Sequence, residues 1–267
     1  MTPKDKVESV SETLDKLRET GTGALIGYLP IGFPNLSQSI EAAITLAGSG
    51  ISAIEFGIPY SDPVMDGPII QRAAQASLDA GFKLKQVFEA VSAVKQATEI
   101  PVLLMSYWNP ILQFGVERFC EQLASVGGSG IITPDLIPDD AAAWIAASNN
   151  SGLDRIFLAA PSSTAQRLAM ITKQSRGFVY AVSTMGTTGV RSELDQAARE
   201  LVARLREVGA ERICVGLGIS TKEQVREVLN YADGAIVGSA LVAALEADGV
   251  SGLRERAMSL VDGIRLG

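Results

Sequence analysis

Short apolar stretches alternate with longer helical patterns along most of the chain. Eight runs rich in Ile, Val, Leu or Phe have the length of strands, and a helical pattern follows each of them. The predicted strands are Ala24–Leu29, Ala53–Ile58, Val102–Met105, Gly130–Thr133, Arg155–Ala159, Phe178–Val182, Ile213–Gly216 and Ala235–Val237. Because these runs are almost continuously apolar, they indicate a parallel sheet that is covered on both faces.

The intervening stretches have the spacing of amphipathic helices. The predicted helices are Ser37–Gly48, Ile69–Ala97, Val116–Ser125, Asp139–Ser148, Ala165–Gln174, Glu193–Val208, Lys222–Asn230, Ala240–Ala247 and Ser251–Ile264. Eight strand-helix units in about 250 residues, with no linker between them, predict an α/β fold consisting of a single (β/α)₈ TIM barrel over residues 1–267. A doubly wound open sheet is the alternative. Its GxGxxG fingerprint is not matched at Gly216–Thr221, because Thr221 stands in place of the third glycine.

An extra amphipathic helix is expected before the first strand. The segment Lys4–Glu19 is rich in charge, and Val10 and Leu14 belong to a set of apolar residues at helical spacing. It does not read as a signal peptide. The longest uncharged stretch, Thr20–Ile40, is interrupted by glycines and prolines and so does not predict a membrane helix of about 20 apolar residues.

The amino-acid composition limits which catalytic groups the chain can use, because its 267 residues include no histidine. This removes the commonest general base, the usual catalytic zinc ligand and any Ser-His or Cys-His pair, so we expect no metal site. The two cysteines, Cys120 and Cys214, are far apart and predicted to be buried, a usage typical of a cytoplasmic protein. A net charge of −7 without a run of Lys and Arg disfavours nucleic acid as a partner.

Glu55 is the first candidate for acid-base chemistry. In the second predicted strand, Glu55 shares one face with small residues, whereas Ile54, Phe56 and Ile58 form the other. The apolar face should meet the helices, which turns Glu55 into the barrel mouth, partly desolvated and with a raised pKa. A strand-end glutamate that is solvated or ion-paired is the competing interpretation.

The loop Pro59–Pro68 follows that strand and contains Asp62 and Asp66. Asp-Pro and Asp-Gly are also ordinary turn dipeptides, so either aspartate alone has a structural explanation. Together with Glu55, however, they supply carboxylates in different environments that could divide acid and base roles.

Glycine-containing segments follow the last three predicted strands: Gly186–Gly189, Gly216–Ser220 and Gly238–Ser239. Barrels of this kind frequently bind phosphate there, through backbone N–H groups and a helix N-terminus, and tight turns are the alternative. Ser220 and Glu223 have the spacing of a capping box. Tyr107 and Tyr180 could line a pocket for a flat aromatic substrate, although most such tyrosines are simply packed.

At these residues the sequence resembles the family of tryptophan synthase α subunits, essentially from end to end. The most specific match is Ile54–Pro68, with the residues IEFGIPYSDPVMDGP. Supporting matches are Met105–Pro110, Pro134–Leu136, Ser183–Gly189 and Gly216–Ile219.

The resemblance implies a (β/α)₈ barrel that cleaves indole-3-glycerol phosphate to indole and glyceraldehyde 3-phosphate in L-tryptophan biosynthesis. Glu55 would be the general acid-base that protonates indole C3, and Asp66 would stabilise charge at the indole N–H. The residues expected to bind substrate are Tyr28, Tyr107, Tyr180, Thr188, Gly189, Gly218, Gly238 and Ser239, with Thr188 in a loop that closes over the pocket and the glycines and Ser239 holding phosphate.

The resemblance also implies a partner, a β subunit that carries pyridoxal phosphate and receives indole in an α₂β₂ complex. Asp62 and Asn109 are expected to face it, and no cofactor is expected on this chain. Two departures lie near the pocket: Tyr28–Pro34 differs from the threonine-containing form of many members, and Met65 replaces a small residue.

Two other functions use the same features. An isomerase or epimerase of a phosphorylated sugar would share the barrel, the phosphate site and one carboxylate, but it would not need the second aspartate or an aromatic lining. A non-catalytic subunit would act by activating its partner. The presence of both Glu55 and Asp66 favours the lyase.

Overall fold

The computed structural model describes residues 9–182, 191–216 and 218–264, with the backbone alone for residues 191–195. Eight parallel strands pair in chain order, and β8 closes on β1 to form a barrel. The strands are β1 (Ala24–Pro30), β2 (Ala53–Gly57), β3 (Val102–Met105), β4 (Gly130–Thr133), β5 (Asp154–Ala159), β6 (Val179–Val182), β7 (Ile213–Gly216) and β8 (Gly234–Val237). The predicted barrel is therefore confirmed.

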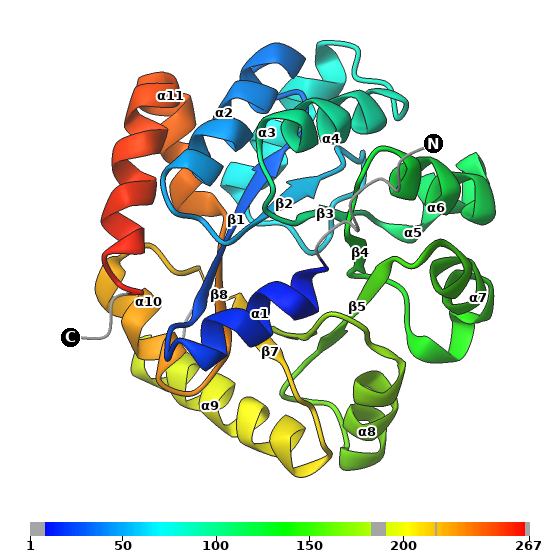
Figure 1. Ribbon diagram of the computed structural model, residues 1–267, viewed down its shortest axis with the longest axis vertical. Helices are drawn as coiled ribbons and strands as arrows, with labels where there is room; N and C mark the ends of the chain where they lie inside the picture. Colours follow the sequence, from blue (N-terminus) through cyan, green and yellow to red (C-terminus); the bar gives the residue numbers. More distant parts are fainter. Residues whose placement is uncertain (1–8, 183–190, 217, 265–267) are drawn as a thin grey trace.

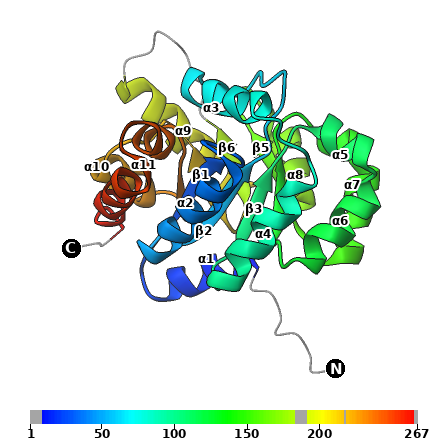
Figure 2. The same ribbon diagram turned by 90° about the horizontal axis from the view of Figure 1, so that it is seen from above.

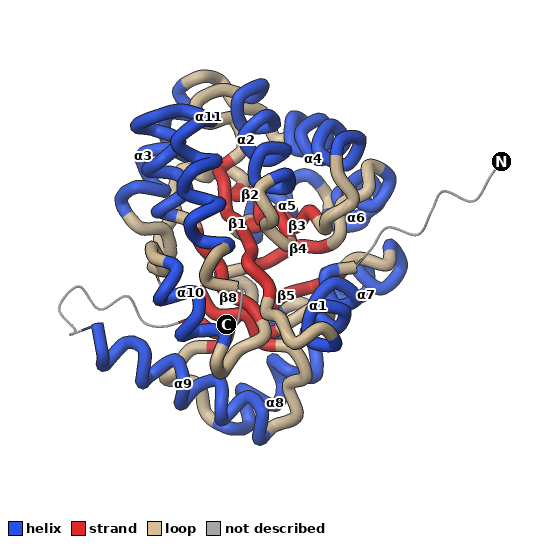
Figure 3. Tube along the Cα trace, turned by 60° about the vertical axis from the view of Figure 1, so that its left-hand side comes forward, coloured by secondary structure: helices blue, strands red, loops and turns tan. Residues whose placement is uncertain are grey.

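Helices surround the barrel, as Figures 1 and 3 show. They are α1 (Val10–Glu19), α2 (Leu36–Gly48), α3 (Pro68–Asp79), α4 (Gln86–Ala97), α5 (Trp108–Phe114), α6 (Val116–Ser125), α7 (Ala142–Ser151), α8 (Ala165–Gln174), α9 (Arg191–Glu207), α10 (Lys222–Leu229) and α11 (Ser239–Val261), with a short 3₁₀ helix η1 (Pro138–Asp140). None of the helices in the described part of the chain is long and apolar enough to cross a membrane.

Two helix predictions need correction. The stretch Ile69–Ala97 is two helices, because Gly81 adopts a left-handed backbone with φ of 86° after α3. Helix α5 was not predicted at all. The two helices predicted near the C-terminus are confirmed as the two parts of α11, which are separated by Gly249, whose backbone is not helical, with φ of 63° and ψ of −155°.

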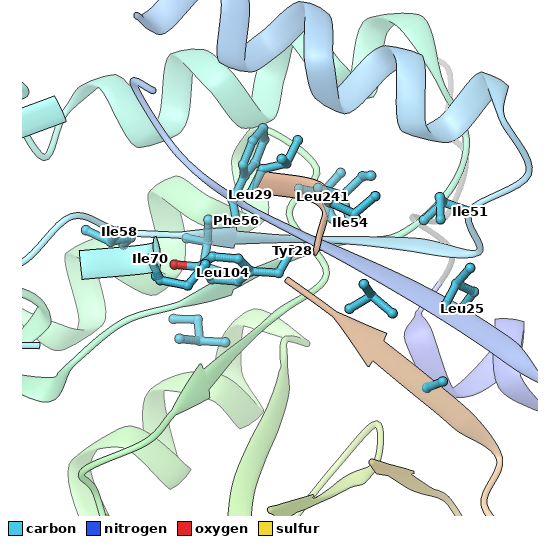
Figure 4. Packing of buried hydrophobic residues seen from close by; sticks show 14 of the residues in the cluster. Leu25, Tyr28, Leu29, Ile51, Ile54, Phe56, Ile58, Ile70, Leu104 and Leu241 are labelled. Atoms are coloured by element: carbon cyan, nitrogen blue, oxygen red, sulfur yellow. The ribbon is translucent and has the colours of Figure 1, made fainter. Parts of the chain in front are cut away.

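Two apolar clusters divide the interior. The outer cluster lies between strands and helices, and Leu29, Ile54, Phe56 and Leu241 in Figure 4 belong to it. The inner cluster fills the barrel and includes Ala53, Leu103 and Ile132. The apolar face of β2 therefore meets the helices as predicted, and the opposite face, which carries Glu55, points into the barrel.

Helix α1 lies across one end of the barrel (Figures 1 and 2). Val10 and Leu14 pack into the inner cluster, and the Val10 N–H donates to Oδ2 of Asp154 at 3.1 Å. Asp154 begins β5, so α1 covers the N-terminal end of the strands. The loops at the C-terminal end remain available for a site.

Candidate active site

A cavity opens among the C-terminal ends of the strands and holds about 820 Å³, including its part open to solvent. This is the position expected for a ligand site in a TIM barrel. The described residues that line it are Tyr28, Glu55, Met65, Asp66, Gly67, Ile70, Met105, Ile132, Leu158, Tyr180, Val182, Gly216, Gly218, Ile236, Gly238 and Ser239.

Glu55 comes from the middle of β2 and lies on the inner wall of the barrel. Only 1% of it is exposed, so it is buried more deeply than the partial desolvation expected from sequence. Its Oε2 is buried without a hydrogen-bond partner among the described residues. Burial, reinforced by the nearby Asp66 carboxylate, raises the pKa of Glu55 to about 8. Glu55 can therefore hold a proton at neutral pH and give it to a bound molecule.

Asp66 reaches the cavity from the loop between β2 and α3. Its backbone is fixed from both sides, because the Asp66 N–H donates to the Pro63 carbonyl at 3.0 Å and Nε2 of Gln71 donates to the Asp66 carbonyl at 2.9 Å. Burial raises the pKa of Asp66 to about 6. At neutral pH the two carboxyl groups thus differ, with Glu55 mostly protonated and Asp66 mostly ionised.

Two tyrosines lie over glycines of the neighbouring strands. A Cβ atom on Gly57 would come within 2.1 Å of the Tyr28 hydroxyl, and one on Gly216 would come within 2.2 Å of the Tyr180 hydroxyl. Figure 4 shows Tyr28 reaching from β1 toward β2. The missing side chains of these glycines create the space in which the aromatic rings lie against the cavity.

Gly218, Gly238 and Ser239 lie together at the rim formed by the loops after β7 and β8. Gly218 has a left-handed backbone with φ of 61°, and Gly238 precedes the first residue of α11, Ser239. Among the described residues, no side chain caps α11, and its first residue lines the cavity, an arrangement that suits an anion. The predicted Ser220–Glu223 capping box is wrong.

The capping box at α10 is instead formed by Thr221 and Gln224, one residue further along. Thr221 has the extended backbone of an N-cap residue, and its side chain accepts the Gln224 N–H at 3.3 Å. Oε1 of Gln224 in turn accepts the Thr221 N–H at 3.1 Å.

The other predicted site residues are distributed differently. Tyr107 is not among the described residues that line the cavity; its hydroxyl oxygen accepts the N–H of Met65 at 2.8 Å. Asp62 and Asn109 are exposed on the loop after β2 and on α5, outside the cavity. Thr188 and Gly189 lie outside the described residues.

An apolar ring of cavity residues was not predicted. Its members are Ile70, Met105, Ile132, Leu158, Val182 and Ile236. Most of them occupy inward-facing positions near the ends of strands, so the alternation that oriented Glu55 could have identified them. These side chains give the cavity walls that suit a flat apolar group.

A closed (β/α)₈ barrel whose cavity holds one buried and one half-buried carboxyl group defines a TIM-barrel enzyme with an acid-base site. The family model for the tryptophan synthase alpha chain matches residues 14–261. The chain belongs to the tryptophan synthase alpha chain family. Membership gives it the role of an alpha chain in tryptophan biosynthesis and a lyase type of activity.

Relatives and solved structures agree over almost the whole chain. The tryptophan synthase alpha chain of Leifsonia xyli subsp. xyli is 57% identical over 254 residues, which cover 95% of this chain and 97% of the relative. A structure of Mycobacterium tuberculosis tryptophan synthase is 49% identical with a TM-score of 0.92, covering 98% of this chain and 100% of that one. A tryptophan synthase complex from Pyrococcus furiosus is 33% identical with a TM-score of 0.83, covering 90% and 98% respectively.

Proposed function

We propose that the chain cleaves indole-3-glycerol phosphate by a retro-aldol reaction to indole and glyceraldehyde 3-phosphate. The observation that carries this proposal is the buried Glu55 carboxyl group, whose Oε2 has no described partner in a cavity that it shares with Asp66. The reaction needs an acid at one carbon of an aromatic ring and a negative charge near its nitrogen. Glu55 and Asp66 have the protonation states for these two roles.

In the proposed reaction, Glu55 first donates its proton to indole C3, which converts the ring to an indoleninium cation that keeps its N–H. The ionised Asp66 accepts a hydrogen bond from the ring N–H and stabilises the positive charge that develops there. The Glu55 carboxylate then takes the proton of the glycerol hydroxyl next to the ring. The carbon-carbon bond breaks, its electrons restore the aromatic indole, and the hydroxyl carbon becomes the aldehyde.

Both proton transfers use one side chain, so Glu55 ends the cycle in its starting state. The phosphate would bind at Gly218, Gly238 and Ser239, where the first N–H groups of α11 are uncapped. Tyr28 and Tyr180 would hold the ring against the apolar wall. These groups supply the acid, the base, the stabilisation of the positive charge and the phosphate site, and we propose that the reaction uses no metal or organic cofactor on this chain.

We further propose that the chain assembles with a pyridoxal-phosphate β subunit into an α₂β₂ complex in the cytoplasm. Four large apolar side chains are exposed on the segments that follow β2, β3 and β4: Val64 at 80%, Met65 at 43%, Leu112 at 53% and Ile137 at 47%. Asp62 and Asn109 lie on the first two of these segments. An apolar group of this kind beside polar residues is typical of a protein interface.

The test of the reaction is indole release from indole-3-glycerol phosphate by the purified chain. We expect Glu55→Gln to lower kcat by about 10²–10⁴-fold while a non-cleavable analogue still binds, because the amide cannot transfer a proton. Glu41→Gln on the exposed face of α2 is the matched control and should leave the rate unchanged. Full activity of Glu55→Gln would contradict the proposed mechanism.

A further inference from the structure

Tyr107 holds the loop that carries Asp66. Its side chain is buried, with 5% exposed, although it does not line the cavity. Its hydroxyl oxygen accepts the N–H of Met65, the residue before Asp66, at 2.8 Å and across 42 positions of the chain. The hydrogen bond therefore fixes the backbone of the long loop next to its functional carboxylate.

The same tyrosine ring also contacts the beginning of this loop. Tyr60 stacks on Tyr107 with ring centroids 5.1 Å apart and an angle of 27° between the planes. Stacked aromatic pairs contribute stability beyond the apolar area that they bury. Tyr107 thus contacts the loop at two points, the ring of Tyr60 and the amide of Met65, which flank the segment 61–64.

Tyr107 is itself held at the end of β3 by two neighbours. The hydroxyl of the buried Ser106 donates to the Tyr107 carbonyl at 2.8 Å, and the Trp108 N–H donates to Oδ1 of Asp135 at 2.9 Å. The Ser106 N–H donates to the Ile132 carbonyl of β4 at 3.0 Å. The loop after β2 is therefore fastened through Tyr107 to the rigid ends of β3 and β4.

We propose that Tyr107 is a positioning residue, which fixes Asp66 opposite Glu55 by accepting the Met65 N–H and stacking on Tyr60. The proposal rests on the function proposed above. Since the side chain of Asp66 projects from the residue next to the clamped amide, a shift of this backbone moves the carboxylate away from the ring nitrogen. Such a displacement of the Asp66 carboxylate weakens transition-state stabilisation more than it weakens substrate binding.

The Tyr107→Phe variant tests the proposal, because it keeps the ring and the stack but removes the hydrogen-bond acceptor. We expect kcat for indole release to fall by about tenfold, with KM changed by less than about twofold. Amide hydrogen exchange at Met65 should become at least about tenfold faster. Tyr60→Phe is the matched control, since it removes the other hydroxyl of the same ring pair, and it should leave kcat and the exchange rate unchanged.

The outcomes separate the two proposals. If the wild-type chain releases no indole, the proposed function fails. If the wild type is active and Tyr107→Phe has the same kcat and the same Met65 exchange rate, the positioning role is overturned. A rise in KM with unchanged kcat also overturns it, because this result would make Tyr107 a substrate contact.

Discussion

At the residue scale, the side chain that the proposed reaction needs most, Glu55, also lowers the stability of the fold. Glu55 is buried without a described partner for Oε2, and its pKa is about 8 rather than the ordinary value near 4.5. The folded protein therefore binds a proton that the unfolded chain releases above pH 4.5. By linkage, the free energy of unfolding falls as the pH rises from about 4.5 to about 8 and changes no further from this source above that range.

Glu55→Gln should consequently stabilise the fold while it lowers kcat. Glutamine has nearly the same shape without the ionisable group, so the variant should match the wild type at pH 4.5 and exceed it by at least about 1 kcal/mol at pH 8. Urea unfolding of both proteins at the two pH values measures this difference. A difference that does not grow with pH would show that the Glu55 proton is not linked to folding.

The pair of carboxyl groups also predicts the pH dependence of the reaction. Asp66 must be ionised and Glu55 must be protonated, so kcat/KM should follow a bell-shaped curve with limbs near pH 6 and pH 8. The two limbs belong to the interacting pair rather than to single residues. Indole release measured from pH 5 to pH 9.5 tests this expectation, and a rate that continues to rise above pH 9 would contradict the acid role of Glu55.

At the scale of the elements, burial on both faces explains why the strands were predictable. Strands such as Val102–Met105 and Ile213–Gly216 are continuous apolar runs, and their observed bounds equal the predicted ones. Helix α5 was missed because a seven-residue helix containing Pro110 has too few turns to show a period. The loop at residues 80–85 was missed because a single left-handed glycine breaks an otherwise helical pattern.

The orientation of Glu55 could be predicted from the alternation in β2, whereas the role inferred for Tyr107 could not. The Tyr107 contacts join two loops across 42 positions, and no local pattern encodes the distance between such segments. The same limit applies to Tyr28, whose ring lies where the side chain of Gly57 would be.

The close approach of Tyr28 in β1 to Gly57 in β2 leads to a further prediction. Gly57→Ala should cost about 1–3 kcal/mol and reduce activity, because its Cβ would meet the Tyr28 hydroxyl at 2.1 Å and force the ring to move. Adding Tyr28→Leu removes the obstructing atoms, so the double variant should be less destabilised than the sum of the single ones. Gly48→Ala in α2, where a Cβ meets nothing within 4 Å, is the matched control. Additive energies would contradict the assigned contact.

At the scale of the whole molecule, one end of the barrel contributes to stability and the other carries the candidate site. The N-terminal end is closed by α1, where Asp15 forms two hydrogen bonds with Arg212 at 2.8 and 2.6 Å. The C-terminal end carries the cavity and the exposed apolar residues on the segments that follow β2, β3 and β4. Figure 2 shows α1 and α3 at opposite ends. Stability and function should therefore respond to separate substitutions.

Leu14→Ala and Leu112→Ala test this separation as a pair. Leu14 is 2% exposed and packs into the inner cluster, so its truncation should cost about 2–5 kcal/mol, while kcat of the folded protein stays within about twofold. Leu112 is 53% exposed on α5, so its truncation should change stability by less than about 0.5 kcal/mol and weaken binding of the β subunit. Urea unfolding, indole release and titration with the β subunit measure the three effects. If Leu14→Ala lowered kcat of the folded protein by more than about twofold, the two ends of the barrel would be coupled and the separation would be wrong.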